Sequence, residues 1–508
     1  MTAQRRGLLG HSVVYGIAQL ATAAAAVGLL PIYTAALTPR DFGAVAVLEL
    51  AMSVVASLTG TSIGSAATRL QFRADPARSK HALWTTGLFA LLAQCGAIAG
   101  IGWLAREPLA AALFGSDHGG GVALIGPLLA LTAVNLISGF CFAYLRALER
   151  STLFLGITLG GLALRIGLNL WLLVALQWGV AGYLWSGAIA GAVQSSVLLL
   201  VLFARRSWSF ERPLWRAIAS FAFPIAIAAL ASLAMHQADL WVLRFRLGDL
   251  TQIGLYAFAY AIVQRANGLL LTPFSSIWSA RLYEIDTGPH RRKAYHRVFR
   301  GFTLVSACAL LALALCSRPV VELLASPEYG PSAELVPILC IGFFLFSLHG
   351  FFVVPALLAG RGGSIAATAV AAAAVGLALC LALVPIAGIR GAAIASVVTY
   401  AVYSFGGHLR YRRFENLRYP FGHLVKLALI ATVAWATRPS TADVASPWAV
   451  LALAAYWSVL ATAVAVLWCG RDLLQRPAGA LPTDRPAEAV VERAIPRQEV
   501  DAVEALLG

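Results

Sequence analysis

The sequence predicts an all-α polytopic membrane protein of about 14 transmembrane helices, built as two parallel six-helix lobes plus two C-terminal helices. Three observations predict this fold. Apolar residues make up 60% of the chain and charged residues only 12%, whereas soluble domains carry about 25% charged residues. Apolar runs of about 20 residues, each long enough to span a bilayer, follow one another along the chain. Short motifs also recur at a nearly constant offset.

The spans follow from the apolar runs, because only helices and closed barrels satisfy their backbone hydrogen bonds in lipid. The sequence has a mean hydropathy of +0.79 and no alternating pattern typical of barrel strands. We place the fourteen spans at residues 12–37, 42–67, 82–104, 122–145, 152–176, 181–204, 216–243, 251–280, 297–317, 333–358, 364–386, 391–409, 421–437 and 447–469.

The two ends of the chain differ in character. A basic start with Arg5 and Arg6 leads into an apolar run that continues to about Leu37 without an Ala-x-Ala exit. We therefore interpret this run as a retained first span and not as a signal peptide. The segment from Arg471 is rich in Pro, Ala, Glu and Arg and has no long apolar face, so we expect a flexible tail.

Lysine and arginine residues are distributed unequally between alternate loops. With the N-terminus inside, 29 of the 38 fall in inner segments and seven in outer segments, and Arg165 and Arg265 remain inside spans. Cytoplasmic loops of membrane proteins carry such an excess. We therefore predict that both termini are cytoplasmic.

Composition also excludes several classes of function. The net charge of +15 comes from residues in short loops, so anionic headgroups account for it better than nucleic acid does. The chain has no phosphate-binding P-loop, no Gly-x-Ser-x-Gly elbow and no His-Glu-x-x-His motif. The longest outer loop, about 105–121, is too short for a catalytic domain. We predict no enzyme activity, no catalytic residue, no cofactor and no metal.

The seven cysteines lie in apolar runs or at their ends, and none forms a Cys-x-x-Cys pair. Such cysteines are typical of buried free thiols, so we predict neither a disulfide framework nor a metal site. They are Cys95, Cys141, Cys308, Cys316, Cys340, Cys380 and Cys469.

An internal repeat relates the two halves of the chain. The Leu37–Gly43 segment, LTPRDFG, is answered by Gly248–Gly254, GDLTQIG, with an offset of 211 between the final glycines. Three further short matches have offsets of 209 to 212 and include Arg69 with Arg281. Six spans per half give both halves the same orientation, as in transporters with parallel repeats. We predict lobes at 1–210 and 211–415, two added helices at 416–470 and a tail at 471–508.

Glycines four residues apart predict close helix packing within the chain, because the absent side chains let backbones approach. The pairs are Gly60/Gly64, Gly96/Gly100, Gly156/Gly160 and Gly187/Gly191.

Few ionisable residues lie inside the predicted spans, and each is a candidate functional group. Arg265 is accompanied by Gln264 and Asn267, and Arg165 by Asn169 one turn away. Acidic and titratable groups are Glu49 in the second span and His236 and Asp239 on one face of the seventh. For His349, among phenylalanines, we expect a packed and hydrogen-bonded side chain.

Two interpretations of these groups stay open. The arginines could each pair with an acid, such as Glu49 or Asp239, and brace the helix bundle. Alternatively they line an aqueous cavity and bind an anion, since the planar guanidinium suits phosphate. Glu49, Asp239 and His236 would then tune or couple the site. Inner-edge arginines, Arg69 and Arg281 among them, would complete a cationic cavity.

The segment from Tyr33 to Gly43, YTAALTPRDFG, together with the two six-span halves and the added spans, resembles the polysaccharide (oligosaccharide) flippase family. This family belongs to the multidrug/oligosaccharidyl-lipid/polysaccharide exporter superfamily. The resemblance covers about residues 10–470. It implies an inner-membrane protein that flips undecaprenyl-diphosphate-linked oligosaccharide to the periplasmic leaflet for O-antigen, capsule or exopolysaccharide synthesis. It also implies alternating access of two lobes around a cationic cavity.

The implied partners are the lipid-linked oligosaccharide, membrane lipids and a polysaccharide polymerase or other biosynthesis proteins. One alternative is a cation-coupled drug or metabolite exporter of the same superfamily, for which acidic cavity groups would be expected. Another is a membrane glycosyltransferase, polymerase or ligase, which would need a sizeable outer loop or an aspartate-rich site. A scaffolding membrane protein is the third.

Overall fold

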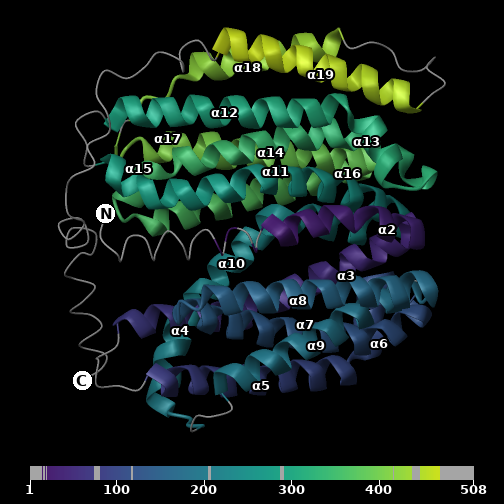
Figure 1. The fold of residues 1–508 in the computed structure, drawn as a ribbon, viewed down its shortest axis with the longest axis vertical. Coiled ribbons are helices and arrows are strands. Elements are labelled where there is room, and N and C mark those ends of the chain that lie inside the picture. Colours follow the sequence, from purple (N-terminus) through teal and green to yellow (C-terminus); the bar gives the residue numbers. More distant parts are fainter. Residues whose placement is uncertain are drawn as a thin grey trace. The chain divides into compact units, whose positions relative to one another are not determined.

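The structure is a computed structural model that describes residues 14, 16, 18, 20–73, 80–115, 118–203, 208–286, 291–415, 417–437 and 447–469. Within these ranges every regular element is helical, and each of the fourteen predicted spans falls on helix (Figure 1). The predicted fold class is therefore confirmed. Arg5, Arg6 and the tail at 471–508 lie outside the described residues.

Nine helices of the described part are long and apolar enough to cross a membrane, and three shorter apolar helices accompany them. Two of the predicted spans share one helix, α16, which is interrupted where Gly388 leaves helical geometry. In chain order the elements are α2 Leu30–Ala36, α3 Pro39–Leu58, α4 Gly60–Arg73, α5 Lys80–Leu104, α6 Arg106–Phe114, α7 His118–Ala147, α8 Ser151–Asn169, η2 Leu170–Ala175, α9 Gly179–Phe203, α10 Arg212–Arg246, α11 Leu250–Asp286, α12 Arg291–Leu315, α13 Ser317–Leu324, η3 Pro327–Glu334, α14 Leu335–Phe352, α15 Val354–Leu358, α16 Gly362–Ala401, η4 Val402–Gly406, α17 Gly407–Tyr411, α18 Phe421–Ala436 and α19 Pro447–Cys469.

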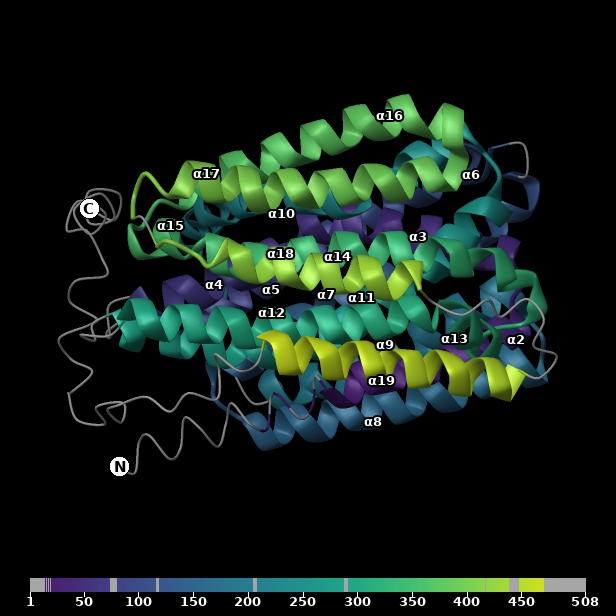
Figure 2. The ribbon, with the colours of Figure 1, turned by 90° about the horizontal axis from the view of Figure 1, so that it is seen from above.

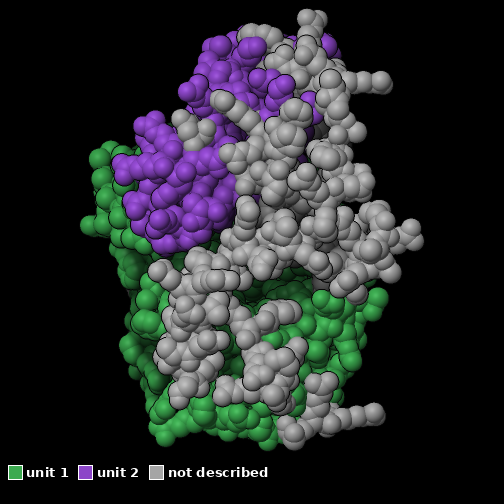
Figure 3. All heavy atoms as spheres, turned by 90° about the vertical axis from the view of Figure 1, so that its left-hand side faces the viewer, with its two compact units in different colours: residues 1–269, 317–339, 369–399 green, residues 270–316, 340–368, 400–508 purple. Residues whose placement is uncertain are grey.

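The chain divides into two compact units, coloured separately in Figure 3. Unit 1 comprises Met1–Leu269, Ser317–Leu339 and Ala369–Thr399, and unit 2 comprises the remaining segments. Each unit is a set of segments that contact one another more than they contact the rest of the chain. This division does not test the predicted lobe boundaries, which stay a prediction.

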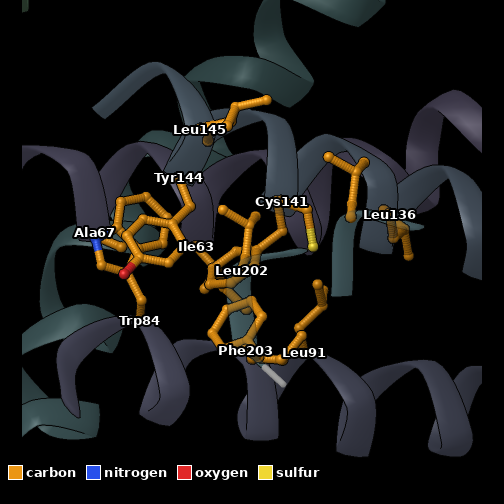
Figure 4. Close-up of a cluster of buried hydrophobic side chains, with 14 of the residues drawn as sticks. Ile63, Ala67, Trp84, Leu91, Leu136, Cys141, Tyr144, Leu145, Leu202 and Phe203 are labelled. Atoms are coloured by element: carbon orange, nitrogen blue, oxygen red, sulfur yellow. The ribbon is translucent and has the colours of Figure 1, made fainter. Parts of the chain in front are cut away.

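A large apolar core in unit 1 is formed by α4, α5, α7 and α9 (Figure 4). Trp84 of α5 stacks on Tyr144 of α7, with ring centroids 4.5 Å apart. The indole nitrogen of Trp84 donates to Oε1 of Gln71 at 2.6 Å, so the buried polar atom is satisfied. Aromatic packing with a satisfied polar edge fixes how these four helices meet.

An aromatic core organises unit 2. Phe274 and Trp278 of α11 pack on Phe351 of α14, and Phe299 of α12 contacts Tyr419. Figure 2 shows α12, α18 and α19 as neighbouring helices, in agreement with their mutual contacts. His349 is buried and stacks on Tyr403, whose backbone oxygen lies 3.2 Å from its Nδ1.

Backbone geometry repeats at the same offset as the sequence motifs. Two non-glycine residues adopt positive φ in the described part, Glu149 at 57° and Gln177 at 52°. Exactly 211 residues later stand Gly360 at 64° and Gly388 at 57°. A non-glycine residue rarely adopts this conformation without a structural requirement. These two pairs of positions therefore share a backbone conformation at the offset of the sequence matches.

The repeated motif after the first span marks a helix start. The Thr38 hydroxyl accepts the Asp41 amide and the Asp41 carboxylate accepts the Thr38 amide, both at 3.2 Å, which forms a capping box with Pro39 at the first helical position. In the second half, Asp249 Oδ1 accepts the Thr251 amide at 2.8 Å. Both motifs thus satisfy the free amides of a helix N-terminus.

The final glycines of the two motifs face each other within unit 1. A Cβ on Gly43 would lie 1.9 Å from the Leu250 carbonyl oxygen, and one on Gly254 would lie 1.8 Å from that of Pro39. The contacts are reciprocal, because each carbonyl lies four residues before the other glycine. Helices α3 and α11 therefore cross with their backbones in direct contact.

The Gly-x-x-x-Gly prediction holds only in part. A Cβ on Gly187 or Gly191 would meet α7 side chains at 2.9 and 2.6 Å, and one on Gly64 would meet Ala143 at 3.3 Å. At Gly96, Gly100, Gly156 and Gly160 a Cβ would meet nothing within 4 Å. The spacing alone was a wrong guide there, because those glycines have no neighbouring backbone to admit. None of the six described cysteines forms a disulfide within the described residues, and four of them are buried; the side chain of Cys469 lies outside the described residues.

Candidate functional site: a polar cluster within the spans

Four helices of unit 1 bring polar side chains together inside predicted spans. We define the polar cluster as Tyr33 of α2, Glu49 of α3, Arg165 and Asn169 of α8, and Tyr183 and Ser186 of α9. The chain has few charged residues in its spans, so a gathering of this kind marks a candidate site.

Tyr183 stands between the acid and the base of the cluster. Its hydroxyl donates to Oε1 of Glu49 and accepts Nη2 of Arg165 at 3.3 Å. The Arg165 guanidinium also lies over the Tyr183 ring, 5.6 Å from its centroid. Direct pairing of Arg165 with an acid is therefore not what the structure shows, because a tyrosine hydroxyl links the two groups.

Asn169 links the cluster residues of α2 and α9 through hydrogen bonds. The side chain is fully buried, its Nδ2 donates to the Tyr33 hydroxyl at 3.0 Å, and its Oδ1 accepts the Ser186 hydroxyl at 2.6 Å. Tyr33 in turn packs edge-on against Tyr183, with centroids 5.4 Å apart. The helix changes to the π-helix η2 directly after Asn169, a feature frequent at functional sites. Asn169 thus connects α8 to Tyr33 of α2 and to Ser186 of α9.

Arg265 of α11 is the second cation near the cluster. It is half-buried, and it lies within electrostatic range of Glu49, Tyr183 and Tyr33. Its Nη1 is buried without a hydrogen-bond partner, and so is Nε of Arg165. A buried donor of a charged group left unpaired is costly. Two guanidinium groups with free donors beside one carboxylate therefore leave positive charge available to an anion.

The other residues predicted to bind substrate differ in their exposure. Gln264 is exposed and Asn267 is buried. Arg69 of α4 is exposed and lies over the ring of Phe221, 4.9 Å from its centroid. The side chain of Arg281 lies outside the described residues. A substrate-binding role for these residues stays a prediction.

Asp239 of α10 is buried and accepts hydrogen bonds from hydroxyl groups outside the polar cluster. Its Oδ2 accepts the hydroxyls of Tyr256 and, at 3.0 Å, Ser396, while its Oδ1 accepts the Leu240 amide at 2.8 Å. These groups, and no arginine, satisfy the carboxylate in the described structure. One turn earlier, the backbone oxygen of His236 accepts the Tyr260 hydroxyl at 3.0 Å. The possibility that Asp239 braces an arginine is therefore wrong for this structure.

Three residues of structural weight escaped sequence reasoning. Tyr183 gave no signal, because tyrosine is common near membrane interfaces, and Tyr33 was noted only as part of the Tyr33–Gly43 motif and not as a site residue. Arg244, one residue beyond the predicted span 216–243, is buried, and its Nε donates to the Leu113 carbonyl at the end of α6. A cation at a helix C-terminus is favourable, which explains this burial. No group of three metal-ligating side chains occurs in the described ranges.

Replacement of Tyr183 by Phe tests whether the hydroxyl link stabilises the fold. We expect a loss of about 1–3 kcal/mol in the free energy of unfolding, because Arg165 loses its acceptor and Glu49 its donor. Thermal unfolding of the purified protein measures it. The control, Tyr456→Phe, removes an exposed hydroxyl in α19 and should change little; equal midpoints for both variants would count against the link.

Residues 35–334 match the model of a family described as polysaccharide biosynthesis protein. The match covers more than half of the chain. The chain belongs to this polysaccharide biosynthesis family. The apolar helices of its described residues are long enough to cross a membrane several times. No curated protein sequence matches the chain.

Solved structures with the same fold are transporters. The lipid II flippase MurJ, in an inward closed conformation, superposes with a TM-score of 0.75 at 11% identity, covering 91% of this chain and 100% of its own. An inward-facing multidrug resistance MATE transporter of the MOP superfamily gives 0.66 at 18% identity, covering 79% and 95%. A MOP superfamily transporter from Pyrococcus furiosus, with a binding pocket of reverse polarity, gives 0.59 at 18%, covering 80% and 96%.

Proposed function

We propose that this member of the polysaccharide biosynthesis family is a flippase for a lipid-linked oligosaccharide. It would move the undecaprenyl-diphosphate-linked glycan from the cytoplasmic to the periplasmic leaflet of the bacterial inner membrane. The observation that carries the proposal is the pair of free, buried guanidinium donors on Arg265 and Arg165 within the spans. The family match and the fold of a lipid II flippase support it.

The charge of the cluster fits a diphosphate. Two guanidinium groups and one carboxylate leave one positive charge in excess, and planar guanidinium groups bind phosphate oxygens through paired hydrogen bonds. The Tyr183 hydroxyl donates a hydrogen bond to Glu49, and Nε of Arg165 has no hydrogen-bond partner. This Nε can therefore donate to another acceptor.

Glu49 and Asp239 are the groups we assign to coupling. Asp239 is buried with hydroxyl donors only, a setting in which gain of a proton or a cation would change its hydrogen bonds to Tyr256 and Ser396. We propose alternating access of two lobes with cytoplasmic termini as the transport cycle, and a polysaccharide polymerase as a partner that receives the flipped glycan.

These carboxylates also favour a second candidate, a cation-coupled exporter of drugs or metabolites. The Pyrococcus furiosus transporter is described as having a binding pocket of reverse polarity that suggests a different function, so the charge of the site is relevant to this choice. Deletion of the gene separates the two. A flippase deletion should abolish surface polymer and accumulate lipid-linked oligosaccharide on the cytoplasmic side, with normal dye efflux. Normal polymer with impaired dye efflux would overturn the flippase proposal.

Replacement of Asp239 by Asn tests the coupling assignment. We expect the variant to reach the membrane at a normal level, because the amide oxygen still accepts from Tyr256 and Ser396 and only the acceptor of the Leu240 amide is lost. Transport should become independent of the proton or sodium gradient and fall about tenfold or more. Glycan flipping in inverted vesicles with each gradient imposed or collapsed measures this. Unaltered gradient dependence would remove Asp239 from the coupling assignment.

A further inference from the structure

Unit 2 contains a pocket that the polar cluster does not use. Its volume is about 540 Å³, within the range of small-molecule sites. It is lined by the turn between α15 and α16 and by the segment that follows α17. Three of its lining residues are arginines, Arg361, Arg410 and Arg413, and no acidic residue lines it.

The arginines of the pocket are held in place but not neutralised. Nε of Arg410 donates to the Ser364 hydroxyl at 2.8 Å, and Arg361 lies over the Phe414 ring, 5.9 Å from its centroid. In the described part of the chain, none of the three arginines has an ion-pair partner. Glu415 follows Phe414 in sequence but does not line the pocket. Three like charges at one pocket repel each other unless an anion joins them.

The backbone adds further donors. Helix α16 begins at Gly362 in the pocket wall, where the helix dipole favours negative charge. The amides of Gly362 and Gly363 precede the first intrahelical hydrogen bond, whereas the Ser364 amide donates to the Arg361 carbonyl at 3.0 Å. A Cβ on Gly362 or Gly363 would meet nothing within 4 Å. These glycines therefore leave an open approach to the amides and are not required by packing.

The equivalent turn in the first half differs by the presence of an acidic residue beside its arginine. Glu149 and Arg150 stand 211 residues before Gly360 and Arg361, and Glu149 shares the positive φ of Gly360. An acid thus accompanies the arginine in the first half, and glycine replaces it in the second. The repeat provides an internal control that lacks the uncompensated charge.

We propose that this pocket binds a phosphate group carried on a lipid at the membrane surface. Its position favours a lipid, because the lining residues directly follow or precede the apolar spans 333–358, 364–386 and 391–409, at the depth of the headgroups. The chemistry recognised is a phosphate or diphosphate, the shared feature of anionic phospholipids and lipid diphosphates. The inference uses other residues than the proposed flippase function and does not depend on it.

The first test compares the full chain in nanodiscs of phosphatidylcholine with nanodiscs that contain phosphatidylglycerol. We expect the anionic lipid to raise the unfolding temperature and to be retained in native mass spectrometry. Inorganic diphosphate added to the phosphatidylcholine nanodiscs forms the second arm. Stabilisation by phosphatidylglycerol alone identifies a lipid headgroup, and stabilisation by both identifies the phosphate itself as sufficient. No stabilisation in either arm overturns the proposal.

Substitutions locate the effect. Arg361→Ala and Arg410→Ala should each weaken retention of the anion about tenfold, since each removes a charge-assisted hydrogen bond. Arg150→Ala, in the equivalent turn, should leave it unchanged. Gly363→Glu places an acid in the pocket at a helix N-terminus, where a carboxylate favours the helix. It should abolish the anion effect without lowering the basal unfolding temperature, and Gly363→Ala should retain the effect. Equal anion responses in Gly363→Glu and Gly363→Ala would contradict the site.

Discussion

Replacement of Arg265 by Ala is expected to reduce surface polymer to the level of a strain without the gene, at an unchanged level of protein in the membrane. Arg265 has a buried Nη1 with no partner, so its removal breaks no hydrogen bond inside the described protein. Stability should be little changed, because the half-buried guanidinium has no hydrogen-bond partner to lose. Immunoblots of the polymer and of the membrane fraction measure both quantities in the same cells.

Two further substitutions sharpen this result. Arg265→Lys keeps the charge but loses the planar fork, so export should be intermediate if a phosphate is bound bidentately. Arg265→Glu adds a second acid within electrostatic range of Glu49 and should be at least as severe as Ala. The control is Arg246→Ala, an exposed arginine at the end of α10, which should export normally. Normal export by Arg265→Ala would remove Arg265 from the substrate site.

The sequence was informative wherever one helix carries the signal by itself. Length and hydropathy of each apolar run predict a span, because the bilayer imposes the same requirement on every helix. An arginine inside such a run is equally visible, which is how Arg165 and Arg265 were found. The offset of 211 was visible too, because the repeat lies in the order of the chain.

Contacts between distant helices were not predictable in this way. The hydroxyl of Tyr183 that separates Glu49 from Arg165 depends on how α3, α8 and α9 meet, and no spacing in the sequence records that. The buried carboxylate of Asp239 likewise accepts hydrogen bonds from the hydroxyls of Tyr256 and Ser396 and not from an arginine. The local rules give the candidates, and tertiary packing chooses among their partners.

Helix crossings show the same limit. Four Gly-x-x-x-Gly pairs predicted close approach, whereas among the described glycines the shortest backbone contacts of an added Cβ are at two isolated glycines, Gly43 and Gly254. A glycine permits close packing but does not cause it. What distinguishes these two is their place in the repeat, since each follows a capped helix start by a few residues.

The crossing makes Gly254→Ala the substitution with the largest expected cost in stability. The new Cβ would lie 1.8 Å from the Pro39 carbonyl oxygen and 2.9 Å from the Gly43 amide nitrogen. Both are backbone atoms, so no side chain can rotate away and the helices must separate. Overpacking of this kind costs about 3 kcal/mol or more in the free energy of unfolding. Thermal or denaturant unfolding of the purified protein measures it.

Gly268→Ala is the matched control, because it makes the same chemical change in the same helix, α11, where a Cβ meets nothing within 4 Å. It should be neutral or stabilising by up to about 1 kcal/mol, as expected for Ala over Gly in a helix. Comparable destabilisation by both alanines would show that the crossing is not tight in solution. Gly43→Ala should resemble Gly254→Ala, and the double variant should cost less than the sum, because one separation of α3 from α11 relieves both clashes.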